Sequence, residues 1–122
     1  MPLVIVAYDP EKVLDPVMGG IIPRIAAIVA EELNSPDDED GKLTIADIEV
    51  WPKRLTAMDF PKPGSENAVH VGITIFANDF PIRKATLKER REKILERVRR
   101  EFHSSVTGFV WIALFPAEFG TF

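Results

Sequence analysis

Residues 1–8 read MPLVIVAY, and this stretch decides the fold that we expect. Its positions 2–8 are apolar almost throughout and rich in β-branched side chains, which is typical of a strand buried on both faces. An Asp-Pro pair at 9–10 ends the strand. If the initiator Met1 is removed, the strand begins with the secondary amine of Pro2. We interpret that amine as the feature of this sequence with a specific chemical meaning.

The length, composition and net charge of the chain limit the class of protein to which it can belong. Its 122 residues predict a single domain spanning 1–122, which buries roughly two thirds of its unfolded surface. The absence of Cys fits a reducing compartment, and a net charge of -4 offers no general attraction for nucleic acid. The apolar run at the start is too short to span a membrane and follows no basic residue. We therefore expect a soluble, cytoplasmic protein with neither nucleic acid nor membrane as a partner.

The periodicity along the chain predicts two similar halves, each built as strand, helix, strand. Asp15 and Pro16 are typical of an N-cap followed by Pro at the first helical position, but Gly19, Gly20 and Pro23 should make the first turns of this helix irregular. Thr86 and Glu89 have the spacing of a capping box at the start of the second helix. The expected elements are a strand at 2–8, a helix at 22–33, a strand at 43–51, a long loop at 52–67, a strand at 68–77, a helix at 86–102 and a strand at 109–115.

The first and last predicted strands carry apolar side chains on both faces, and this has a consequence for assembly. Two helices can cover one face of a four-stranded sheet. The other face would leave an apolar surface exposed in a monomer. We therefore predict an α+β fold, a four-stranded mixed sheet with two helices on one face and other subunits against the second face.

Several stretches together resemble the tautomerase superfamily. They are the Met-Pro start of a Pro-Leu-Val-Ile-Val strand, the two strand-helix-strand halves, the strand VHVGITI at 69–75, and RKATL at 83–87 before the second helix. The superfamily includes 4-oxalocrotonate tautomerase, 5-carboxymethyl-2-hydroxymuconate isomerase, macrophage migration inhibitory factor and the cis-3-chloroacrylic acid dehalogenases. The resemblance covers essentially the whole chain, and the Met-Pro start is its most distinctive element.

The resemblance implies a homotrimer that acts on a small carboxylated keto, enol or unsaturated acid, as an isomerase or as a hydratase or dehalogenase-like lyase. It implies that Pro2 is the acid/base group and that Arg83 with Lys84 binds the substrate carboxylate. It also matches Glu118, weakly, to a water-activating carboxylate in some dehalogenase-like members. An amine in an apolar pocket has its charged form disfavoured and can exchange a proton near neutral pH. Arginine suits carboxylates because its donors are planar and bidentate.

The sequence also departs from the family pattern. Glu49 occupies the position in the second strand where oxalocrotonate-type members carry an Arg, so Arg54 or Lys53 from the following loop would have to supply that cation. If Met1 is retained, the nitrogen of Pro2 is an amide and has no lone pair to act as a base. The alternative is a non-catalytic binding or regulatory module with a ferredoxin-like or tautomerase fold.

Other patterns in the chain have ordinary explanations. His70 and His103, without any Cys, are too few for a zinc site. The acidic run at 37–41 lacks the carboxylate that an EF-hand needs at its first position. The arginines of the second helix alternate with glutamates, as on a solvated helix face. We therefore expect no metal and no other cofactor.

Overall fold

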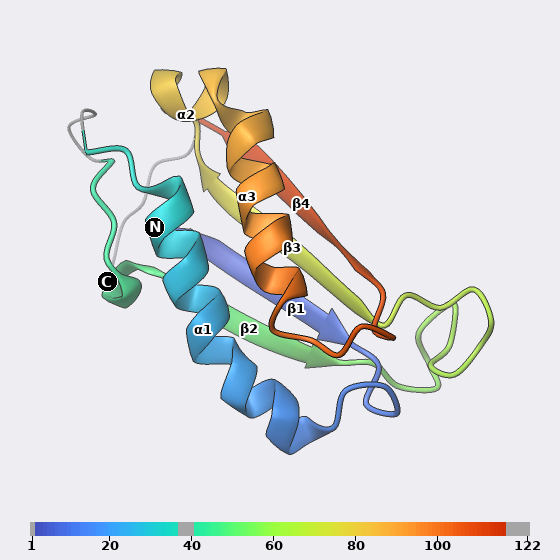
Figure 1. Cartoon of the computed structure of the whole chain (residues 1–122). Coiled ribbons are helices and arrows are strands. Elements are labelled where there is room, and N and C mark those ends of the chain that lie inside the picture. The colour runs from blue at the N-terminus through green and yellow to red at the C-terminus, as the bar shows by residue number, and fades with distance from the viewer. Residues whose placement is uncertain (1, 37–40, 117–122) are drawn as a thin grey trace, which may run out of the picture.

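The computed structural model describes residues 2–36 and 41–116. In this part of the chain the elements follow the predicted order of two strand-helix-strand halves, and both long helices lie on the same face of one sheet (Figure 1). The elements are β1 (Leu3–Tyr8), α1 (Asp15–Leu33), the 3₁₀ helix η1 (Ile45–Asp47), β2 (Glu49–Arg54), β3 (Val71–Asn78), α2 (Pro81–Ala85), α3 (Leu87–Arg99) and β4 (Gly108–Phe115).

The described strands form a four-stranded mixed sheet in the order β2-β1-β3-β4. β1 runs parallel to β2, β3 runs parallel to β4, and the central pair β1 and β3 is antiparallel. The predicted α+β architecture is therefore confirmed. Each half contributes two adjacent parallel strands, so the sheet lacks the interleaved halves of the split, ferredoxin-like arrangement that we considered as an alternative.

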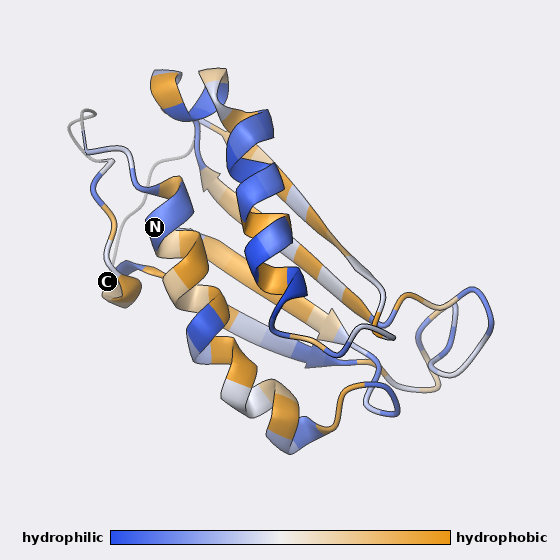
Figure 2. Cartoon of the chain, viewed as in Figure 1, coloured by the Kyte–Doolittle hydropathy of each residue, from blue (hydrophilic) through white to orange (hydrophobic). Residues whose placement is uncertain are grey.

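The core lies between the sheet and the two long helices. Val4 and Val6 of β1 and Ile75 of β3 have no exposed surface, and Ile25 and Val29 of α1 are equally buried. Figure 2 shows this apolar band along the inner side of α1 and the sheet. Within α1 the side chain of Ile21 is buried, and that of its neighbour Ile22 is half-buried against the same core.

α1 begins at Asp15, the residue predicted as its cap, and is helical from there, whereas we expected its first turns to be irregular as far as residue 22. Its residue Pro23 lies inside the helix, where the missing N–H removes one backbone hydrogen bond. Burial of Met18 and Ile21 against the core offsets that cost, which explains why the early turns are helical. The residue before the helix, Leu14, provides no side-chain cap.

The second strand lies further along the chain than predicted. β2 runs from Glu49 to Arg54, so the first three residues of the predicted loop belong to the strand. Thr44 and Asp47 instead form a capping box around η1, in which the Asp47 carboxylate accepts the Thr44 backbone N–H at 2.8 Å. Pro52 fits within β2 because β2 is an edge strand, so the backbone groups on its outer side have no neighbouring strand to bond.

The predicted capping box at Thr86 is wrong. The Thr86 hydroxyl donates to the Ile82 carbonyl at 2.7 Å and accepts from Nε of Arg90 at 2.7 Å, so it links α2 to α3. The second predicted helix corresponds to α3, which ends at Arg99 rather than at position 102, and α2 lies in the segment before it, where no helix was predicted. β3 starts at Val71, three residues later than predicted.

Candidate functional site

Pro2 is buried immediately before β1, at the end of the sheet that we call the Pro2 end. Its carbonyl accepts the backbone N–H of Glu49 at 3.2 Å. The next residue, Leu3, lies opposite Phe76 of β3, so the carboxyl end of β3 meets the amino end of β1 here. The carboxyl end of β4, which pairs with β3, reaches the same place (Figure 1). We call the opposite end, where β1 finishes at Tyr8, the Tyr8 end.

Arg83 lies at the Pro2 end but on the helix side of the sheet, and its side chain is 1% exposed. Its Nη1 donates to the carbonyl of Asn78 at 3.0 Å, and its Nη2 donates to the carbonyl of Leu33 at 3.0 Å. The guanidinium carbon also lies 4.8 Å from the centre of the Phe80 ring. Leu33 is the last residue of α1, so Arg83 connects the C-terminal end of that helix, where the helix dipole is negative, to the C-terminal end of β3.

Lys84, the neighbour of Arg83, points into solvent, with 73% of its side chain exposed. Its Nζ lies 3.7 Å from Oδ2 of Asp79, too far for a hydrogen bond, so this is a loose ion pair. The other oxygen of Asp79, Oδ1, is buried and has no hydrogen-bond partner among the described residues. Sequence reasoning missed Asp79, because the connector after β3 has no periodicity that would distinguish one polar residue from the next.

Arg54 lies at the Tyr8 end, because β2 is parallel to β1 and pairs Arg54 with Tyr8. A strand of six residues spans roughly 20 Å, so one chain does not bring Arg54 and Pro2 together. The Arg54 Nε lies 3.3 Å from each oxygen of Asp15. The Tyr8 hydroxyl donates to Asp15 at 2.7 Å, and this bond, together with burial, raises the pKa of Tyr8. Lys53 pairs with Asp59 at 2.9 Å.

Glu118 lies outside the described residues, as does Met1. Of the predicted site residues, the structure thus brings Pro2, Arg83 and Lys84 to one end of the sheet, with different accessibility, and places Arg54 at the other. Within ranges 2–36 and 41–116, no group of three or more His, Cys, Asp or Glu side chains could hold a metal ion. No helix of those ranges is long and apolar enough to cross a membrane.

The sheet face away from the helices is apolar and open. A cross-strand row runs through all the strands, with Trp51, Ile5, Thr74 and Trp111 side by side. Trp51 is 53% exposed and Trp111 is 67% exposed, although each side chain has a large apolar area to bury. Phe109 of β4 is also largely exposed on this face, where its ring lies over Gly72.

No family model and no curated protein matches this sequence. Solved structures do match its fold. A fused 4-OT wild-type symmetric trimer has a TM-score of 0.59 at 13% identity and covers 93% of this chain and 85% of its own. A macrophage migration inhibitory factor-like protein from Entamoeba histolytica has a TM-score of 0.53 at 10% identity, with 95% and 86% covered. Pt0534 inactivated by 2-oxo-3-pentynoate has a TM-score of 0.55 at 14% identity, with 93% and 85% covered.

These structures match the backbone arrangement of this chain over nearly its whole length. Their identities are low, so the similarity concerns the backbone arrangement and leaves the chemistry to be argued from the residues themselves. The structural matches agree with the resemblance found in the sequence, and the chain has the fold of the tautomerase superfamily.

Proposed function

We propose that this chain is a tautomerase-type enzyme in which Pro2, freed by removal of Met1, moves a proton on a small carboxylated keto or enol acid. One observation carries the proposal: a buried proline immediately precedes β1, one of the two central strands of a tautomerase fold, at the sheet end where Lys84 offers an accessible positive charge. The neighbouring fold members named above support the class of chemistry, and the substrate follows from the charge at the site.

The proposed reaction needs only a nitrogen lone pair. Pro2 takes a proton from the carbon beside a ketone carbonyl, the electrons of that C–H bond form a C=C bond, and the carbonyl oxygen becomes an enolate. Return of the proton to the oxygen gives the enol, and the reverse sequence gives the ketone. An apolar environment disfavours the charged amine, so Pro2 can release the proton as readily as it takes it.

The substrate carboxylate requires a cation that solvent can reach. Lys84 meets that condition, because its partner Asp79 holds it only loosely. We assign Arg83 a positioning role in this proposal, since its bonds to two backbone carbonyls hold the segment that carries Lys84. Arg54 can join the site only from another subunit. Glu118 would activate water if the reaction is a hydration or dehalogenation.

The open sheet face supports a homotrimer, the assembly in which the 4-OT structure was solved. We expect a mass in solution of three times the 13.7 kDa of one chain. Trp111→Glu should give the monomer, because it places a charge in the buried interface. Phe60→Glu is the matched control, since Phe60 is 99% exposed on the loop after β2. A wild-type monomer in light scattering would contradict the assembly.

Covalent labelling tests the proline directly. With 2-oxo-3-pentynoate, the reagent that inactivated Pt0534, the free nitrogen of Pro2 should add to the alkyne, and the resulting carbanion takes up a proton. Intact mass should show one adduct per chain, and peptide mapping should locate it at Pro2. Pro52→Ala should label at the wild-type rate and Pro2→Ala far more slowly. Equal labelling of the two variants, or an adduct elsewhere, would contradict the proposal.

A second candidate is a non-catalytic binding module with the same fold. Glu49 favours this candidate. Its backbone N–H donates to the carbonyl of Pro2, and the negative charge of this exposed residue would repel an acidic substrate. The Nε1 of Trp51 donates to the Glu49 carboxylate at 2.9 Å, so the acid is held in place. Retained Met1, together with ligand binding and no turnover, would identify this candidate.

A further inference from the structure

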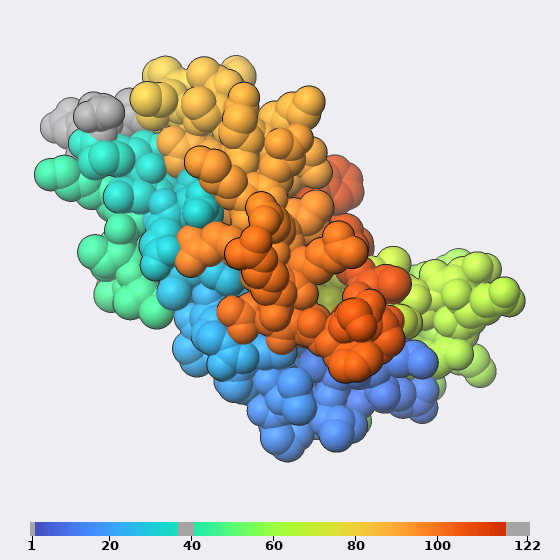
Figure 3. All heavy atoms as spheres, viewed as in Figure 1, coloured from blue at the N-terminus to red at the C-terminus, as the bar shows by residue number. Residues whose placement is uncertain are grey.

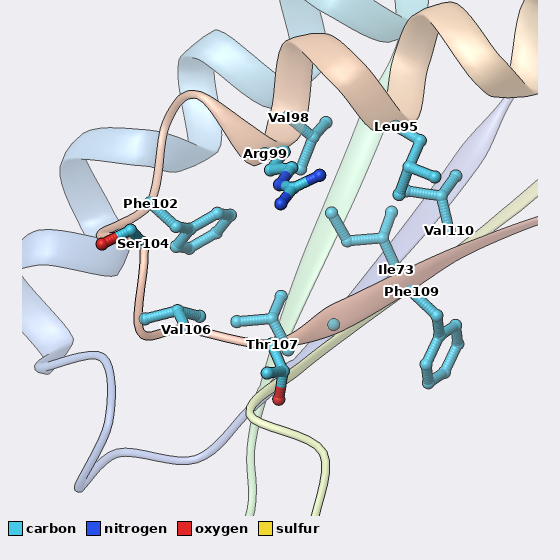
Figure 4. Close-up of a pocket in the computed structure, with 12 residues that line it drawn as sticks. Ile73, Leu95, Val98, Arg99, Phe102, Ser104, Val106, Thr107, Phe109 and Val110 are labelled. Carbon is cyan, nitrogen blue, oxygen red and sulfur yellow. The ribbon is translucent and has the colours of Figure 1, made fainter.

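A cavity of about 330 Å³ opens at the Tyr8 end, on the helix side of the sheet. It lies between the end of α3, the segment 100–107 and the first residues of β4, beside α3 in the space-filling view (Figure 3). Most of its lining is apolar, and in the close-up Val98, Phe102 and Val110 surround it (Figure 4). Its volume falls at the lower end of the range for small-molecule sites, about 300 to 1,000 Å³.

Arg99 gives this cavity a charge. In Figure 4 its guanidinium lies between Phe102 and Ile73, and because Arg99 is an exposed residue, this charge lies at the open side of the cavity. No hydrogen bond or ion pair of the Arg99 side chain is formed with any described residue, whereas four neighbouring arginines each have a partner. Those arginines are Arg90, Arg91, Arg97 and Arg100. A cation beside apolar groups is stabilised by an anion that shares the recess.

The wall of the cavity is held in place by hydrogen bonds. The backbone N–H of Val106 donates to the carbonyl of His103 at 2.9 Å, and that of Thr107 donates to Nδ1 of His70 at 3.0 Å. Val71 in turn donates its N–H to the carbonyl of Thr107 at 3.1 Å. A ligand therefore meets a wall that is already formed, so little ordering opposes binding.

We propose that this cavity binds an anionic amphiphile, a molecule with one carboxylate that pairs with Arg99 and an apolar body that lies against Phe102 and Val110. At about 30 Å³ for each group the size of a water molecule, the cavity holds roughly ten non-hydrogen atoms. A straight-chain carboxylate of medium length has that size. The site is at the opposite end of the sheet from Pro2, and so it does not depend on the proposed catalytic function.

Octanoate is the probe for this site. In a titration of ¹⁵N-labelled protein followed by NMR, we expect shifts confined to the end of α3, the segment 100–107 and the start of β4. Octan-1-ol, which has the same chain without the charge, should bind at least about ten-fold more weakly, because a charge-assisted hydrogen bond is lost. Arg99→Gln should lower the affinity for octanoate by a similar factor and leave that for octan-1-ol unchanged.

Arg100→Gln is the matched control, because Arg100 directly follows α3, pairs with Glu96 and does not line the cavity. It should bind octanoate like the wild type. Val106→Phe, which fills the cavity from its loop wall, should abolish binding of both probes. The proposal is overturned if folded wild-type protein does not bind octanoate, if Arg99→Gln and Arg100→Gln weaken binding equally, or if the shifts map to residues 78–84.

Discussion

The two ends of the sheet use their charged groups in different ways. At the Tyr8 end, the two cations of β2 are paired within the chain, Arg54 with Asp15 and Lys53 with Asp59. At the Pro2 end, Arg83 is buried against backbone carbonyls, while Lys84 is exposed beside a loosely held Asp79. Paired charges stabilise a fold, and accessible, weakly paired charges are the ones that can bind a substrate. Among the predicted site residues, the comparison therefore favours Lys84 at the Pro2 end over Arg54 as the cation that binds the substrate.

The largest expected effect is at the Pro2 end. Replacing each of its two adjacent cations by Met tests whether one is structural and the other is free to bind a substrate. Arg83→Met should lower the free energy of unfolding by about 3 kcal/mol or more, because two buried carbonyls lose charge-assisted hydrogen bonds. Lys84→Met should change it by less than about 1 kcal/mol, since its ion pair is exposed. Urea unfolding gives both values. Similar losses in the two variants would show that the cations do not differ in role.

At the Tyr8 end, Asp9 is expected to be structural. Its carboxylate is fully buried and accepts the backbone N–H of Glu11 at 2.8 Å and of Gly64 at 3.0 Å. Asp9→Ala should cost about 2 kcal/mol of unfolding free energy and speed proteolysis within residues 55–70. Glu11→Ala, an exposed change in the same turn, should stay within about 0.5 kcal/mol. Equal proteolysis of both variants would contradict this role.

The smallest expected effect is on the titration of Tyr8, the single tyrosine of the chain. The hydrogen bond to Asp15 raises the pKa of Tyr8, and the field of Arg54 lowers it. The stabilisation that protonated Tyr8 provides through this hydrogen bond is therefore complete below the ordinary pKa of about 10. It is lost as the pH rises through the raised pKa. Phenolate absorbance should show an earlier transition in Asp15→Ala and a later one in Arg54→Gln. Identical transitions would contradict the pairing at this end.

The sequence predicted the architecture because its strands and helices have clear periods. Alternation along β3 and the continuous apolar run of β1 give the sheet, and the apolar second face follows from the same pattern. The first turns of α1 were predicted to be irregular because of Gly19, Gly20 and Pro23, but burial of Met18 and Ile21 offsets the cost of these residues in the helix.

The candidate site was less predictable because it depends on contacts between distant residues. Whether Arg83 or Lys84 turns inward is decided by the carbonyl of Leu33, 50 positions earlier in the chain. The position of Arg54 depends on the register of β2 beside β1, which a strand prediction that ended at residue 51 did not contain. Local sequence patterns carry neither piece of information.

The central claim is that Pro2 is a free amine that transfers protons. The most direct measurement is the rate of phenylpyruvate tautomerisation by wild-type protein and by Pro2→Ala, in samples whose intact mass shows that Met1 is absent. The account predicts a loss of kcat/KM of about 100-fold or more in Pro2→Ala, the usual contribution of a general acid/base, and none in Pro52→Ala. Wild-type turnover in Pro2→Ala, or turnover by protein that retains Met1, would contradict it.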